Sequence, residues 1–215
     1  MEKLIEELKG FEKNINEVTN EIELQYLFEK LAPAFLYGGY IKVREDYRVY
    51  IKTVEFYFHS ENGNGIHDPI VYHRNGRYLE EVPYFPLMFL HAHSSGFDIT
   101  FESKTRKYRA SALIRSYEIK NKEGEYLIWN KNTSMFAKSK EYGYNTQSTY
   151  LYTLLNGFAL GSHNDIIWED APRDKKKVSS KPRQNVFHYD ENNGGFIKTK
   201  KRCERKWSFT REERV

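Results

Sequence analysis

Residues 47–58 read YRVYIKTVEFYF, and this stretch decides the fold. From Tyr40 to Phe58 the side chains alternate with a period of two, which is typical of a β-strand with one buried face. The alternation places on one face the side chains of Tyr47, Val49, Ile51, Thr53, Glu55 and Tyr57. The stretch therefore predicts one long strand or a bent pair of strands.

Further strands are predicted on the C-terminal side of this stretch. Residues 108–119 (YRASALIRSYEI) predict a second long strand, and residues 87–103 predict two short strands joined near 94–96. Shorter strands are predicted at residues 70–73, 126–129 and 206–210.

Apolar residues at helical spacing predict two helices before the sheet. The first covers residues 2–18, and the second covers 21–32 with Pro33 after its end. A third helix is predicted at 146–160, where Gly161 would end it. Together the elements predict an α+β fold, with a curved, mainly antiparallel sheet and flanking helices.

The length of 215 residues fits a single domain covering 1–215. Within it, residues 1–35 are expected to form a helical cover, and 170–195, rich in Pro, Lys, Asn and Gly, are expected to be mostly loop. Residues 172–215 carry 14 Lys and Arg against 6 Asp and Glu, a net charge of +8, whereas the rest has 20 against 24, a net charge of −4. This basic segment predicts either a contact with a polyanion or a solvated tail.

Composition excludes several protein classes. The one cysteine, Cys203, argues against a disulfide scaffold and against a zinc site built on thiolates. No apolar run approaches the roughly 18 residues of a membrane span, and the acidic start MEKLIEELKG differs from a signal peptide, so a soluble cytoplasmic protein is expected. Aromatic residues make up 16% of the chain, which suits stacking on flat ligands but equally suits a β-rich core.

Two charged residues on apolar strands are candidates for chemistry. Glu55 lies within VEFYF, where a desolvated carboxylate would have a raised pKa and could act as a general base; the alternative is a strand-edge glutamate that faces water. Arg115 lies within ASALIRSYEI and needs a carboxylate, carbonyl or phosphate partner. His91 and His93, with Asp98 or Glu102, form a weak metal-site pattern.

Read in order, several short motifs resemble one family, the alkyladenine (3-methyladenine) DNA glycosylases. The motifs cover about residues 50–170: VEFY at 54–57, His67, Arg74-Asn75, HAHSSGFDITFE at 91–102, ASALIRSYEI at 110–119 and FALGSHND at 158–165.

The resemblance implies a role for each matched residue. Glu55 would activate water for attack on the sugar C1′, and Arg115 would help to hold that water and the backbone. Tyr57 would stack on the flipped base, and His67 would bond near the base and phosphate. No metal or cofactor is implied, and the partner would be nucleic acid, DNA in preference to RNA, bound by a monomer.

The chain departs from the family pattern at the surface that flips the base. Ser95 stands where the family has a bulky wedge residue, with Phe97 as the only local substitute. Ala92 replaces a second pocket aromatic residue, and Glu102 replaces a pocket asparagine, with Asp98 as another candidate polar reader. The expected function is hydrolysis of the bond between a modified purine-type base and its sugar. The alternatives are a non-catalytic binding module of the same fold, and an accessory protein.

Overall fold

The stretch at residues 47–58 lies in the longest strand pair of the protein. The computed structural model describes residues 1–62, 65–68, 70–71, 82–93, 96–128, 166–172, 174, 177–192 and 195–212. Its helices are α1 (Glu2–Asn14), the short 3-10 helix η1 (Ile15–Glu17) and α2 (Glu21–Tyr37). The strands are β1 (Gly39–Val43), β2 (Tyr47–Ser60), β3 (Leu90–His93), β4 (Gly96–Thr100), β5 (Tyr108–Asn121), β6 (Tyr126–Ile128), β7 (Ile166–Asp170), β8 (Val178–Lys181), β9 (Phe187–Asn192), β10 (Gly195–Arg202) and β11 (Ser208–Arg211).

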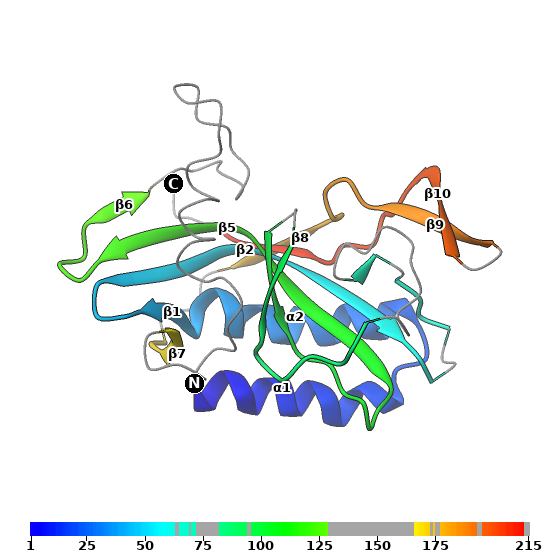
Figure 1. The fold of residues 1–215 in the computed structure, drawn as a ribbon, viewed down its shortest axis with the longest axis horizontal. Coiled ribbons are helices and arrows are strands. Elements are labelled where there is room, and N and C mark those ends of the chain that lie inside the picture. Colours follow the sequence, from blue (N-terminus) through cyan, green and yellow to red (C-terminus); the bar gives the residue numbers. More distant parts are fainter. Residues whose placement is uncertain are drawn as a thin grey trace.

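A nine-stranded antiparallel sheet forms the body of the protein, in the order β3-β4-β5-β2-β1-β7. One side of β2 pairs with β5 over its whole length. On the other side, the first half of β2 pairs with β1 and the second half with β11, which in turn pairs with β8. Because β2 changes partner halfway along, the sheet curls, and the fold is α+β with a curled antiparallel sheet and two α-helices (Figure 1).

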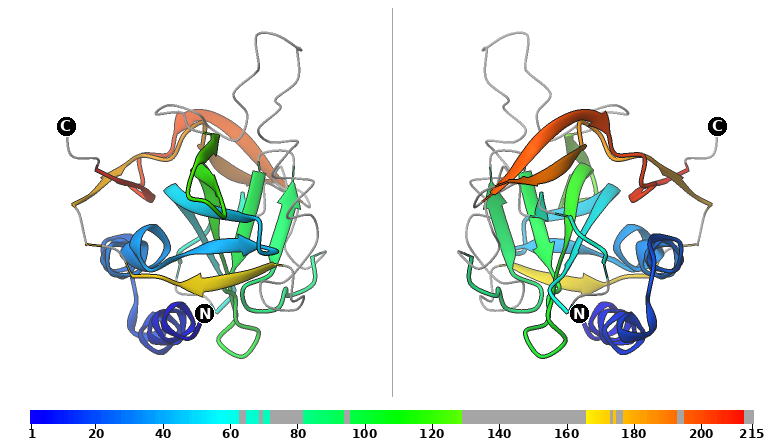
Figure 2. Two further views of the ribbon diagram at one scale, coloured as in Figure 1. Left: turned by 90° about the vertical axis from the view of Figure 1, so that its left-hand side faces the viewer. Right: turned by 90° about the vertical axis from the view of Figure 1, so that its right-hand side faces the viewer.

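Helices α1 and α2 cover one face of this sheet, here called the helix face, and the opposite face is called the far face (Figures 1 and 2). α1 buries Leu4, Leu8 and Phe11, which lie on one side of the helix. The Asn20 side chain caps α2 by accepting hydrogen bonds from the amides of Ile22 and Glu23, each at 3.0 Å. In the described part of the chain, no helix has both the length and the apolar character needed to cross a membrane.

The main core lies between the helices and the helix face, and aromatic rings dominate it. Phe56 of β2 stacks on Phe28 of α2 with ring centroids 4.6 Å apart and has Phe35 5.7 Å away. Phe11 of α1 lies 5.3 Å from Phe101, at the end of β4. The aromatic composition noted in the sequence is therefore used largely for core packing.

The alternation of side chains changes phase in the middle of β2 and β5. On β2 the main core takes odd-numbered side chains up to Ile51 and even-numbered ones from Val54 onward. The phase changes at the same place on β5, where the main core takes odd-numbered side chains from Tyr117 onward and even-numbered ones up to Ile114. The pairing register between the two strands is irregular there, between Ile51 and Val54 of β2. A shift of one residue turns later side chains to the opposite face, so Glu55 points to the far face. The predicted common face for Ile51 and Glu55 is therefore wrong.

Polar side chains fill the point where the phase changes. The Thr53 hydroxyl lies 2.8 Å from the Ser116 hydroxyl and 3.1 Å from that of Thr210 on β11. Next to them the Lys52 ammonium lies 3.0 Å from the Glu118 carboxylate, which also accepts from Arg211 at 2.8 Å. These contacts satisfy buried polar groups at a place where the β-ladder is interrupted.

Most of the strands predicted from the sequence are confirmed. The bent pair is β1 and β2, residues 108–119 lie in β5, and residues 87–103 contain β3 and β4. Three expectations are wrong. α2 continues through Pro33 to Tyr37 because Phe35, Leu36 and Tyr37 bury their side chains.

The other two errors concern strand content. Ile70 and Val71 lie in a turn and not in a strand, and residues 170–195 contain β8 and β9 and the start of β10. The C-terminal segment is not simply a tail, since β8 and β11 belong to the main sheet. The helix predicted at 146–160 lies outside the described residues.

Replacing Phe56 with alanine should destabilise the protein by about 3–5 kcal/mol, because the residue is fully buried among other rings and its loss leaves a cavity. Chemical denaturation gives the free energy of unfolding. The control is Ile22→Ala on α2, where the side chain is 82% exposed and the expected change is within about 0.5 kcal/mol. Equal effects of the two substitutions would contradict this core assignment.

Candidate functional site

Glu55 lies at the centre of a polar cluster on the far face, and it is only 1% exposed. Its Oε2 accepts a hydrogen bond from the Tyr57 hydroxyl at 3.2 Å and lies 3.1 Å from Nε of Arg115. Its Oε1 accepts from the backbone amide of Gln184 at 3.0 Å. The alternative that Glu55 faces water at a strand edge is therefore wrong.

The pairing of the strands explains this arrangement. In register, Glu55 lies between Leu113 of β5 and Ser208 of β11, and Leu113 lies next to Asp98 of β4. These residues form a row across four strands, in which Asp98 is also fully buried. Two carboxylates thus occupy one row of the sheet, with Arg115 two residues further along β5 than Leu113.

Arg115 and Gln184 bind Glu55 from two directions and also bind each other. The Arg115 guanidinium donates to the Gln184 carbonyl at 3.4 Å, while the Gln184 amide donates to Glu55. Gln184, in the segment before β9, therefore contacts both Glu55 and Arg115, which also contact each other. This contact fixes the orientation of the carboxylate, because each of its oxygens has at least one donor.

Arg183, the residue before Gln184, forms a second buried ion pair next to the first. Its Nη1 lies 2.5 Å from the Asp68 carboxylate and donates to the Phe56 carbonyl at 3.2 Å. The guanidinium carbon lies 4.5 Å from the ring centre of Tyr57 and 4.9 Å from that of Trp207. Burial lowers the pKa of Arg183, but Asp68, together with Tyr57 and Cys203, raises it more, so the pKa lies above its ordinary value.

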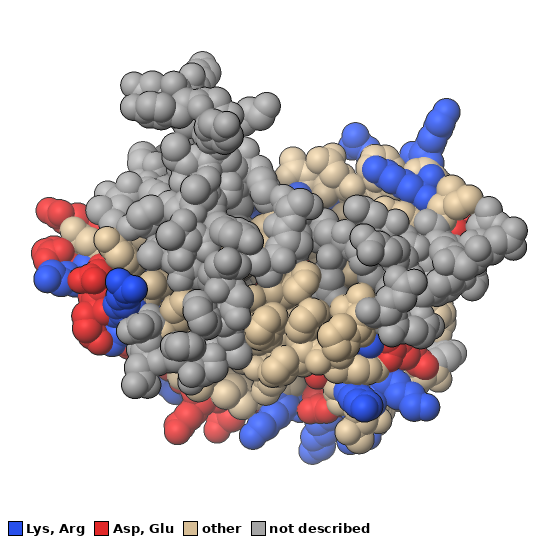
Figure 3. Space-filling model, in the orientation of Figure 1, with Lys and Arg blue, Asp and Glu red and all other residues tan. Residues whose placement is uncertain are grey.

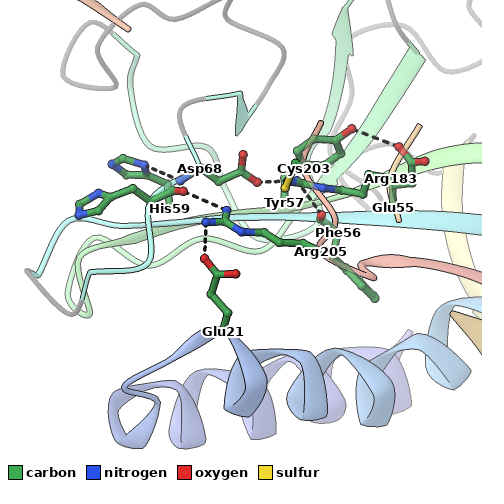
Figure 4. A network of polar contacts seen from close by, with 10 residues as sticks. Glu21, Glu55, Phe56, Tyr57, His59, Asp68, Arg183, Cys203 and Arg205 are labelled. Atoms are coloured by element: carbon green, nitrogen blue, oxygen red, sulfur yellow. Dashed lines mark hydrogen bonds and ion pairs between the residues drawn. The ribbon is translucent and has the colours of Figure 1, made fainter. Parts of the chain in front are cut away.

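Tyr57 connects the two ion pairs. Its hydroxyl donates to Glu55 and its ring packs against the Arg183 guanidinium, so the side chain contacts both ion pairs (Figure 4). Burial raises the pKa of Tyr57 well above 10.0, and the negative charge of Glu55 raises it further. Tyr57 is therefore a neutral hydrogen-bond donor at physiological pH.

His67 lies next to His59, on the side of Asp68 that is remote from Glu55. Its ring is 5.1 Å from that of His59, whose Nδ1 accepts from the Asp68 amide at 3.2 Å. The residue is exposed, and its carbonyl accepts from Arg205, which also lies 2.5 Å from the Glu21 carboxylate (Figure 4). Among the predicted site residues, the structure brings Glu55, Tyr57 and Arg115 together, and His67 is connected to them indirectly, through His59, Asp68 and Arg183.

The remaining predicted residues lie elsewhere. Phe97 is 1% exposed within the main core, so in this structure its ring does not face a ligand. Glu102 accepts a hydrogen bond from the Phe85 amide and lies 3.7 Å from Nη1 of Arg109, which gives it a structural role. Ala92 pairs with Phe97 through the β3 backbone, and Ser95 lies outside the described residues.

The weak metal pattern yields a single close pair. His91 Nδ1 lies 3.7 Å from the buried Asp98 carboxylate. Within the residues that the structure describes, no group of three or more His, Cys, Asp or Glu side chains is placed to hold a metal ion.

Sequence reasoning missed Arg183, Asp68 and Gln184. Arg183 and Gln184 follow Pro182 in a segment that was expected to be loop, and Asp68 precedes Pro69 in another. Gln184 acts through its backbone, so its residue type carries no signal. Cys203 lies 3.7 Å from Arg183 and is buried with Tyr57 in a small cluster on the far face.

The cluster has the donors and charges to hold a reactive carboxylate. An ionised carboxylate has about four acceptor positions, and protein donors occupy three of those on Glu55. Among the described residues, no protein donor occupies the remaining position, which is on Oε1. Two hollows lined by described residues, one at Asn14–Lys30 and one beside Pro33, lie on the helices and do not include Glu55.

Removing Arg183 should leave Asp68 as an unpaired buried charge. We expect Arg183→Met to destabilise the protein by about 3–5 kcal/mol at neutral pH, and the double variant Arg183→Met/Asp68→Asn to recover part of that loss. Denaturant unfolding of all four members of the cycle measures the coupling. Strictly additive effects would contradict a direct pair.

The buried tyrosines should make stability depend on alkaline pH. The folded pKa values of Tyr57, Tyr108 and Tyr117 lie above 10.0 because of burial. Their contribution is therefore complete below pH 10 and is lost as the pH rises through the folded pKa values, since the unfolded state then releases protons that the folded state keeps. In this range Tyr57→Phe should reduce the decline of unfolding free energy by about 1.4 kcal/mol per pH unit.

The control for this experiment is Tyr26→Phe on α2, whose ring is 57% exposed and whose replacement should leave the slope unchanged. Denaturant unfolding at several pH values above 10, followed by tyrosine absorbance, gives the slope of unfolding free energy against pH for both variants. An unchanged slope in Tyr57→Phe would contradict the burial of its hydroxyl.

Comparison with known proteins adds no family to this geometry. No family model, no curated protein and no solved structure matches the chain.

Proposed function

We propose that the protein hydrolyses the bond between a modified purine-type base and its sugar in nucleic acid, acting as a monomer on DNA in preference to RNA. The observation that carries the proposal is Glu55, a buried carboxylate on the far face that is held by Tyr57 and Arg115. These are three of the four residues to which the sequence resemblance gives roles. An α+β architecture with a carboxylate strand, a β3–β4 hairpin and an aliphatic strand, in that order, supports a glycosylase-like fold.

The proposed reaction needs one carboxylate and one water. A water on the remaining acceptor position of Oε1 would give a proton to Glu55 while its oxygen attacks C1′ of the sugar. The bond between C1′ and the base nitrogen breaks, the base leaves with the bond electrons, and the proton that Glu55 took from the water passes to the released base, which restores the carboxylate. No metal, cofactor or covalent intermediate is required for these steps.

The neighbours of Glu55 have separate parts in this proposal. Arg115 and the Gln184 amide hold the carboxylate in a fixed orientation before the reaction, because both donate to it. Tyr57 stays neutral and holds Oε2, which leaves Oε1 for the water. Arg183 covers the Tyr57 ring on one side and Tyr57 is only 1% exposed, so a captured base would stack on the other side of the ring after the residues packed there move.

A second candidate is a binding module of the same fold without turnover. The observation that favours it is the saturation of Glu55, because three of its four acceptor positions are already used by protein donors. In this case the carboxylate organises the cluster and reads a donor group of the ligand. The hydrolase and the binding module would use the same residues around Glu55, but only the hydrolase would release a base.

We expect Glu55→Gln to lower base release at least about 100-fold, because the amide cannot take the proton of water. Release is measured from oligonucleotides carrying alkylated or deaminated bases, as single strands and as duplexes. The matched control is Glu118→Gln, which changes another buried strand glutamate and should lower stability without stopping release.

Two outcomes would contradict hydrolysis by Glu55. Unchanged release in Glu55→Gln would exclude the carboxylate as the base. Binding of the modified oligonucleotides by the unaltered protein, with no release of any base, would favour the binding module.

A further inference from the structure

The β9–β10 hairpin projects from the body of the protein. The two strands pair with each other and form a separate two-stranded sheet, distinct from the nine-stranded one. Figures 1 and 2 show the hairpin on the side of the sheet opposite α1 and α2, which is the side that holds Glu55. An isolated ribbon of this kind gains little from packing, so its position depends on how its base is attached.

The base of the hairpin is attached directly to the candidate site. Gln184, which holds Glu55 and Arg115, is three residues before the first residue of β9. After β10, the amide of Cys203 donates to the carbonyl of Val186 at 2.9 Å and closes the base, where both residues are buried beside Tyr57. The hairpin is therefore fixed relative to Glu55 through short, buried contacts.

The returning strand carries most of the charge. Residues 198–206 hold six Lys and Arg against one acidic residue, Glu204. The exposed cations of the strand itself are Lys198, Lys200, Lys201 and Arg202. Figure 3 shows blue side chains gathered at the upper right, over β9 and β10.

These cations differ from three arginines of the C-terminal segment. Arg183, Arg205 and Arg211 are each paired with a carboxylate of the body, namely Asp68, Glu21 and Glu118. In contrast, in the part of the chain that the structure describes, the four cations of β10 have no ion-pair partner. The hairpin therefore presents four exposed cations within five consecutive positions, 198–202.

An irregularity in β10 groups the cations along the strand. The register shifts between Lys198 and Arg202, and the Thr199 hydroxyl fixes this bulge by donating to the His188 carbonyl at 3.0 Å and accepting from the Lys201 amide at 3.2 Å. Lys198 also packs over the Phe187 ring at 4.1 Å, which orients its ammonium. The positive charges therefore follow a line along the hairpin and are not gathered at its tip.

We propose that the β9–β10 hairpin binds the phosphate backbone of the nucleic acid whose base enters the Glu55 site. The inference rests on the proposed function for the identity of the partner. A linear track of unpaired cations matches a linear polyanion, and a two-stranded ribbon is narrow enough to lie in a nucleic-acid groove. The base of the hairpin is attached next to Glu55, which favours a partner that also enters the candidate site over a lipid surface.

The test is binding of a fluorescein-labelled 20-nucleotide DNA, as a single strand and as a duplex, measured by anisotropy between 50 and 200 mM KCl. All proteins carry Glu55→Gln, so that turnover does not affect the signal. The triple variant Lys198→Gln/Lys200→Gln/Lys201→Gln should bind more weakly, and the slope of log K against log salt should become shallower by about two to three. The control triple variant, Lys9→Gln/Lys13→Gln/Lys104→Gln, removes the same charge from exposed sites elsewhere and should keep the slope.

The outcomes separate this inference from the proposed hydrolysis. If the hairpin variant binds DNA with an unchanged slope, or if both triple variants lose the same amount, the hairpin is not the binding surface, whatever the fate of the base. If DNA binding depends on the hairpin while no base is released by the protein with native Glu55, the inference holds and the hydrolysis fails. Hairpin-dependent binding to vesicles with 30 mol% phosphatidylserine, without binding to DNA, would overturn the nucleic-acid assignment.

Discussion

The phase change in β2 and β5 is the constraint on which the site depends. Before it, odd-numbered side chains of β2 enter the core under the helices, and after it even-numbered ones do. Without the change, Glu55 would point into the aromatic core under the helices, where a buried charge without donors is costly. With the change, the same residue faces Arg115, and its neighbours Val54 and Phe56 reach the core.

Buried charge then determines how the C-terminal segment folds onto the sheet. Glu55 and Arg183 are both almost completely removed from water, and each has its charged partner within hydrogen-bond distance. Two neighbouring residues of one short segment hold these ion pairs. Arg183 is itself paired with Asp68, and the amide of Gln184 donates to Glu55, the partner of Arg115. Because breaking either contact would leave a buried charged group with fewer partners, the segment has one strongly preferred position.

The sequence was informative wherever one local pattern dominated. Period-two alternation identified β2 and β5, and helical spacing identified α1 and most of α2. The odd positions of Glu55 and Arg115 among apolar neighbours indicated that they needed partners, and the structure pairs them. The phase change was not predictable from alternation, since it leaves the composition of both strands unchanged.

The missed features have a common physical cause. β8, β9 and β10 are short and polar, because at least one face of each meets water, so they lack the apolar pattern of an inner strand. Arg183 is one of many cations in a Lys-rich segment, and only its contact with Asp68, 115 residues away in the chain, distinguishes it. α2 passes Pro33 because tertiary packing of the residues after it outweighs the lost hydrogen bond.

The pairing of β11 with the second half of β2 has a consequence for the order of assembly. Thr53 and Thr210 are 157 residues apart in the chain, and Glu55 is 129 residues from Gln184. Contacts of such long sequence separation close late, and a growing polypeptide on the ribosome carries the β2 segment long before its partners are made. During that interval the carboxylate remains hydrated, and its desolvation is one of the last events in maturation of the nascent chain.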